Sequence, residues 1–229
     1  MRKTMIVSTA VAAATALTVG VLAATAGDGT TMTTAPGMHT GHAMRTTTAA
    51  TVTASDLRST LGRMLGEHAA LAMNATNLGV TGSKSFPAAA KALDRNSVEL
   101  SKAIGSLYGP AAGKKFLDGP FQWRAHIGFF VDYTVALAKK DKAGQATAVK
   151  NLTTYTKMHG AFLAGATGLP RLAVQNDLLG HVLELKNQLD AYAAGNYTKA
   201  ANLYRDAYAL MFMTGDLLAG AIAKQKNLK

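Results

Sequence analysis

Apolar residues recur every three or four positions through most of the chain after residue 55, and this helical period is the strongest constraint on the fold. Alternating stretches of Val, Ile and Thr, which would predict strands, are few in the same region. Hydrophobic residues make up 48% of the 229 residues and charged residues only 16%, so the chain can bury a core. We therefore predict an all-α fold.

Turn and capping residues divide the helical pattern into six long helices and one short one. The long helices are expected near 55–78, 85–107, 123–139, from 144 to 165 or 168, 171–192 and 197–222, and the short one at 111–117. Short turns favour an antiparallel helical bundle of three hairpins. Leu65-Gly66-Glu67-His68 resembles Leu178-Leu179-Gly180-His181, which predicts a repeated hairpin unit; chance similarity between Ala-rich segments is the alternative.

The first 26 residues have the pattern of a secretory signal peptide. Arg2 and Lys3 precede an uncharged apolar run from Ile6 to Ala24, and the small residues of 24–26 fit a cleavage site after Ala26. An uncleaved membrane anchor is the alternative, because the run is almost long enough to span a bilayer. We predict a signal peptide over 1–26, a Thr/Ala/Gly-rich linker over 27–54 and the bundle domain over 55–229. The protein is then secreted or extracytoplasmic, at the cell surface or in a compartment like the periplasm.

The charge and the missing cysteine restrict partners and cofactors. The formal net charge is +11, and +9 once Arg2 and Lys3 leave with the signal peptide. Such a basic surface could attract anionic cell-envelope polymers, whereas nucleic acid is not expected for an exported chain. After cleavage no stable membrane span is predicted. The absence of Cys excludes disulfides, thiolate metal sites, iron–sulfur clusters and covalently attached haem.

The linker contains a compact group of possible metal ligands. Met38, His39, His42 and Met44 place two thioethers and two imidazoles within seven residues. Soft thioether and borderline imidazole ligands suit copper, and a flexible segment can close around an ion. A chance cluster in a segment of low complexity is the alternative.

A second set of possible ligands follows from the hairpins. His126 and Met158 are equally distant from the turn near residue 142, and His181 and Met213 are equally distant from the turn near residue 197. Residues equidistant from a turn lie at one level of an antiparallel hairpin, so each His is expected beside a Met. His159 adds another imidazole at the first of these levels.

These residues allow a copper site with His and Met ligands, or non-covalent haem ligation between the aromatic side chains of Trp123, Phe129, Phe130 and Tyr133. An iron site of the di-iron bundle type is disfavoured, because the Glu-x-x-His motif is absent. The structural alternative is that His68, His126 and His181 are internally hydrogen-bonded histidines near the core, with Met filling gaps.

No common catalytic motif is present: the sequence lacks Gly-x-Ser-x-Gly, a Walker loop, His-Glu-x-x-His and Gly-x-Gly-x-x-Gly. We therefore predict a secreted, non-enzymatic protein that binds a transition metal, with copper as the expected ion. A cell-surface structural or interaction module without metal is the first alternative, and a haem carrier is the second.

Two segments, 126–134 and 211–216, resemble a family of exported helical bacterial proteins whose function is poorly defined. Some members are labelled as similar to the N-terminal region of a copper amine oxidase, and the resemblance covers about residues 55–225. It favours copper but implies no amine oxidase activity. Those enzymes need a tyrosine-derived quinone and a His-x-His copper pair, whereas Tyr197 is followed by Thr198 and no His-x-His is present.

Overall fold

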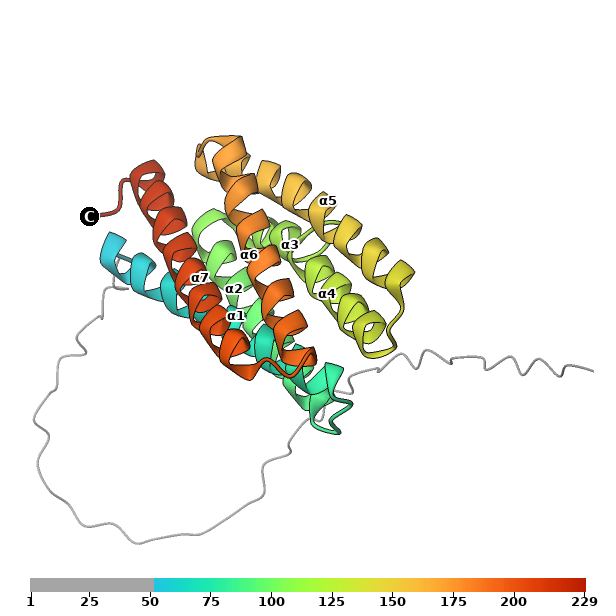
Figure 1. Ribbon diagram of the computed structural model, residues 1–229. Helices are drawn as coiled ribbons and strands as arrows, with labels where there is room; N and C mark the ends of the chain where they lie inside the picture. The colour runs from blue at the N-terminus through green and yellow to red at the C-terminus, as the bar shows by residue number, and fades with distance from the viewer. Residues whose placement is uncertain (1–51) are drawn as a thin grey trace, which may run out of the picture. The chain divides into compact units, whose positions relative to one another are not determined.

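The computed structural model describes residues 52–229, and within this range it contains seven helices and no strand (Figure 1). The helices are α1 (Ala54–Val80), α2 (Phe86–Tyr108), α3 (Pro110–Leu117), α4 (Trp123–Ala138), α5 (Lys142–Thr167), α6 (Arg171–Ala193) and α7 (Tyr197–Lys226). The all-α bundle is therefore confirmed, with six long helices and a short one. The signal peptide, the linker and its Met38–Met44 cluster lie outside the described residues, and the repeated hairpin unit remains a prediction.

The first helix begins earlier than its sequence signal indicated. The sequence predicts a helix from about residue 55, where Ser55 could serve as N-cap, but the cap is Thr53, whose side chain accepts a hydrogen bond from the backbone N–H of Asp56. The Asp56 carboxylate in turn accepts a hydrogen bond from the backbone N–H of Thr53 at 3.1 Å. This reciprocal pair satisfies two of the backbone donors that a helix start leaves free.

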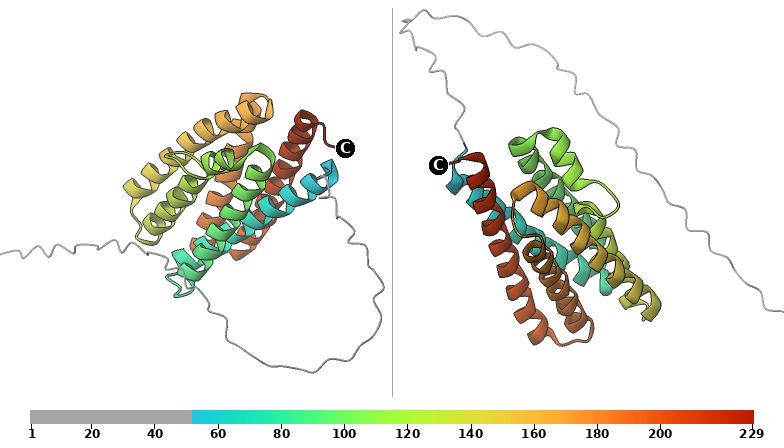
Figure 2. Two further views of the ribbon diagram at one scale, coloured as in Figure 1. Left: turned by 180° about the vertical axis from the view of Figure 1, so that it is seen from behind. Right: turned by 90° about the horizontal axis from the view of Figure 1, so that it is seen from above.

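The central helix is α1, which contacts α2, α4, α6 and α7. It packs most extensively against α7, and the two helices run side by side in both views of Figure 2. Glycine allows this close approach: a Cβ added to Gly215 of α7 would lie 2.8 Å from the Cα of Gly62 in α1. The two backbones therefore touch, as in membrane and soluble helix pairs built on small residues.

The start of α1 is bonded to the C-terminal residue, and the helices share one continuous core. The backbone N–H of Ala54 donates to the carbonyl oxygen of Lys229 at 2.8 Å. The α4–α5 and α6–α7 pairs form antiparallel hairpins (Figure 1), and the core contains buried side chains from all seven helices. By length and composition alone, α7 is the one described helix that could cross a membrane, and 39% of its most apolar window is buried inside the bundle.

Candidate metal centre

Three helices bring three imidazoles together in the middle of the bundle. His68 of α1, His126 of α4 and His181 of α6 each offer one ring nitrogen, and these nitrogens all lie within 4.8 Å of one another. The Nε2 atoms of His68 and His126 are 3.3 Å apart. All three side chains are buried, with at most 2% of their surface exposed. The described residues thus contain a compact three-histidine group, far apart in sequence and closed off from solvent.

Burial keeps these imidazoles neutral. It lowers the pKa of His68 and of His126 well below the ordinary range, and the neighbouring imidazoles lower both further. Burial lowers the pKa of His181 to about 4. At neutral pH each ring is therefore uncharged and carries one lone pair, which is the form that binds a metal ion.

Most of the cluster's ring nitrogens lack a hydrogen-bond partner. Neither nitrogen of His181 has one among the described residues, nor does Nδ1 of His68. The hydroxyl of Tyr155 and the indole N–H of Trp123 are also buried without a partner. An unpaired buried polar group costs about 1–3 kcal/mol, so a native core seldom gathers so many without a ligand or internal water.

Aromatic rings enclose the three histidines. The Trp123 ring centroid lies 4.7 Å from that of His68 and 4.9 Å from that of His126. Tyr155 of α5 stacks on His126 at 4.5 Å. These contacts fix the ring planes and exclude bulk water, which are the two conditions that a preorganised metal site needs.

A fourth buried imidazole, His159 of α5, lies beside the group but is held differently. Its Nδ1 is 2.7 Å from Oε1 of Gln122, so the ring donates from Nδ1 and leaves its lone pair on Nε2. Burial lowers the pKa of His159 to about 3. Its ring stacks on Tyr155 at 5.2 Å. His159 is therefore a supporting residue of the wall rather than a member of the three-histidine group.

The separation of the nitrogens fits a single small ion. Metal–nitrogen bonds of about 2.0–2.1 Å at a tetrahedral angle place ligand nitrogens about 3.3–3.4 Å apart. The His68–His126 distance of 3.3 Å already has this value. Because all three nitrogens lie within 4.8 Å of one another, an inward movement of His181 would complete the set. The group contains no carboxylate, so the site supplies three neutral ligands.

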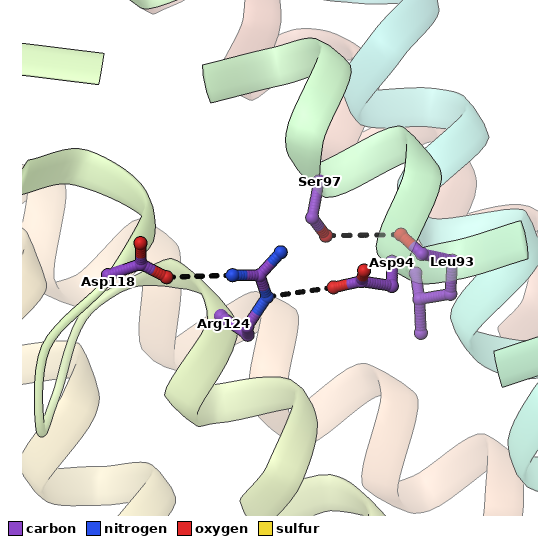
Figure 3. Close-up of polar contacts among 5 residues, drawn as sticks. All are labelled: Leu93, Asp94, Ser97, Asp118 and Arg124. Atoms are coloured by element: carbon purple, nitrogen blue, oxygen red, sulfur yellow. Dashed lines mark hydrogen bonds and ion pairs between the residues drawn. The ribbon is translucent and has the colours of Figure 1, made fainter. Parts of the chain in front are cut away.

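An ion-pair bridge fixes the start of α4, the helix that carries Trp123 and His126. Arg124 donates from Nε to Asp94 of α2 and from Nη1 to Asp118, the last-turn cap of α3, both at 2.8 Å (Figure 3). The Arg124 side chain is 42% exposed, so each pair stabilises the fold by only about 0.2–1 kcal/mol. Its main effect is geometric, because it holds three elements in register next to the histidines.

The structure separates the predicted Met ligands from the histidines. Met158 is 56% exposed and Met213 is 61% exposed, whereas His126 and His181 are buried. The prediction that each His lies beside a Met is therefore wrong. Distance from a turn fixes the level of a residue along a hairpin but not the face of the helix on which its side chain lies. At both positions the next residue, His159 or Thr214, faces the interior.

His68 was not among the predicted ligands, although two sequence signals pointed to it. It lies on the apolar stripe that includes Leu61 and Leu65, and its tetrapeptide resembles the one that ends at His181. A polar residue on the buried face of an amphipathic helix is a candidate site residue. The contact of α1 with α4 and α6 could not be derived from local patterns.

Searches with this chain against protein-family models, curated proteins and solved structures gave no match. The family resemblance noted in segments 126–134 and 211–216 therefore stays a hypothesis, and the function must be inferred from the site.

Proposed function

We propose that the protein binds one transition-metal ion through His68, His126 and His181, and that this ion is copper in its cuprous state. The observation that carries the proposal is the convergence of three neutral, buried imidazoles whose nitrogens lie within 4.8 Å. Both nitrogens of His181 lack a partner, so metal binding would satisfy a polar group that otherwise destabilises the core.

The charge of the site favours a monovalent ion. Three imidazoles and no carboxylate leave the full charge of the ion in an apolar interior. The solvation cost of burying an ion rises with the square of its charge, so a divalent ion costs about four times as much as Cu(I). Imidazole is a good ligand for copper, and three-coordinate Cu(I) needs no further ligand. Zn(II) with a fourth, water ligand is the nearest competitor.

The same geometry disfavours the haem alternative. Haem iron takes at most two axial protein ligands, one on each side of the macrocycle. Here three ring nitrogens converge on one point, which leaves no room for a porphyrin between them. A single ion uses all three donors at once.

The test is anaerobic Cu(I) titration of tag-free full-length protein against a chromogenic Cu(I) chelator, with metal analysis and X-ray absorption of the loaded form. We expect one tightly bound equivalent in the bundle, with three nitrogen ligands. His181→Leu should remove that equivalent. His159→Leu is the matched control, since it makes the same change at an equally buried imidazole and should retain the ion.

A second variant separates the bundle from the linker. Substituting Ser for the linker ligands Met38, His39, His42 and Met44 should leave the bundle equivalent in place. If His181→Leu and wild type bind Cu(I) alike, the three-histidine site is refuted, and loss of binding in the linker variant would assign the ion to the linker. If wild-type protein binds no metal, the basic surface becomes the leading feature, and attachment to anionic wall polymers is the function to test.

A further inference from the structure

An apolar cavity of about 270 Å³ lies beside the three-histidine site and is separate from it. Its inner wall consists of buried side chains from five helices: Leu61, Leu100, Trp123, Leu178, Met211 and Ile222. The wall is almost entirely apolar. Cavities of this kind stay dry and bind apolar molecules. The volume is also far above that of the small voids that ordinary packing leaves in a core.

The outer wall of the cavity is half-buried and carries one charged side chain, Lys115, while Lys226 contacts the lining residue Tyr108. Tyr108 and Phe162 are partly exposed, and Lys115 is exposed. The Nζ of Lys115 lies 5.9 Å from the Phe162 ring centroid, and the Nζ of Lys226 lies 4.3 Å from that of Tyr108. No carboxylate among the described residues lines the cavity. The cavity therefore joins an apolar interior to a cationic edge.

We propose that this cavity binds the tail of a single-chain anionic amphiphile of the fatty-acid type, with its head at Lys115. A cavity of about 150 Å³ holds the six carbon atoms of benzene, so 270 Å³ scales to about eleven carbon atoms. The ammonium group of Lys115 matches a carboxylate and disfavours a cationic head. This inference does not depend on the metal proposal, although Trp123 borders both sites.

The first test is a chain-length and head-group series on the full-length protein, measured by calorimetric titration below the micellar range. Each added methylene should raise the affinity of hexanoate, octanoate and decanoate about fourfold. The gain should stop near eleven carbons, where the cavity is full, so tetradecanoate should bind no more tightly than dodecanoate. Decyltrimethylammonium, which has the same tail and the opposite head charge, should bind about tenfold more weakly than decanoate. Equal binding of the two decyl compounds would overturn the proposed orientation.

Three variants locate the ligand. Lys115→Glu should weaken decanoate binding about tenfold, because it replaces an attraction by a repulsion. Lys114→Glu is the matched control: it makes the same charge change at an exposed neighbour outside the cavity wall and should alter the affinity less than about twofold. Leu218→Trp, at the half-buried edge, should block decanoate while the far-UV spectrum stays unchanged. The site would be refuted if all three variants bound decanoate as tightly as wild type, or if wild type did not bind decanoate.

Discussion

Replacing His181 by Leu should make the metal-free protein more stable. His181 is 1% exposed, and neither of its ring nitrogens has a hydrogen-bond partner among the described residues. Each unpaired group costs about 1–3 kcal/mol, and Leu has a similar volume without polar atoms. Repacking an isosteric side chain costs less than about 1.5 kcal/mol. We expect the free energy of unfolding to rise by about 2 kcal/mol, which for a domain of this size corresponds to roughly 4–8 °C in Tm.

The assay is thermal and urea unfolding of wild type, His181→Leu and His159→Leu in the presence of a strong chelator, followed by circular dichroism. His159→Leu should gain less or lose stability, because it breaks the hydrogen bond between His159 and Gln122. Adding Cu(I) should then raise the stability of wild type by about 2.7 kcal/mol at a free concentration of one hundred times Kd, and leave His181→Leu unchanged. With Cu(I) bound, the stability of wild type would therefore equal or exceed that of His181→Leu.

A metal-free His181→Leu protein that is less stable than wild type by more than about 1 kcal/mol would refute this reasoning. It would mean that the imidazole of His181 has partners in the folded protein, such as internal water. The cluster would then be a polar network of the core, and the unpaired nitrogens would no longer support a metal site.

Two further predictions follow from burial and from helix packing. Because burial lowers the pKa of His159 to about 3 and of His181 to about 4, the unfolded chain binds protons between pH 6.5 and 4 that the folded protein excludes. Falling pH over this window should remove roughly 5 kcal/mol of stability from these two residues, so the metal-free protein should unfold in an acid titration, and a flat profile would contradict the burial. Gly215→Ala should destabilise the fold by about 1–3 kcal/mol, because its Cβ would lie 2.8 Å from the backbone of Gly62. Gly220→Ala, on the same helix with open space at its Cβ, should instead stabilise the protein by about 0.5–1 kcal/mol in the same unfolding assay.

The helices could be predicted from the sequence because their signals are local. The period of Leu57, Leu61 and Met64 gives a buried stripe, and Gly109 followed by Pro110 ends one helix and starts the next. The beginning of α1 was misplaced by two residues because Thr53 and Ser55 are both good caps. Only the reciprocal bond with Asp56 distinguishes them.

The site could be predicted only in part, because it depends on which helix faces meet. His126 and His181 were predicted as ligands from their spacing about the hairpin turns, and both lie in the three-histidine group. Their expected Met partners lie on the outer faces of α5 and α7. The third histidine, His68, comes from α1, whose most extensive contact is with α7. No local sequence pattern reveals that α1 also contacts α4 and α6, which carry the other two histidines. The residue types indicated the chemistry of the site, whereas the sequence did not indicate which helices bring these residues together.

The packing of α1 against α7 has a consequence for the time at which the protein can fold. These helices are each other's main partners, yet the end of α1 at Val80 and the start of α7 at Tyr197 are separated by more than a hundred residues. At about 5–20 residues per second, a ribosome makes that interval in roughly 6–25 s, during which the apolar face of α1 has no α7 to cover it. The first helix made is thus among the last to be completed, and its surface stays available to chaperones during that interval.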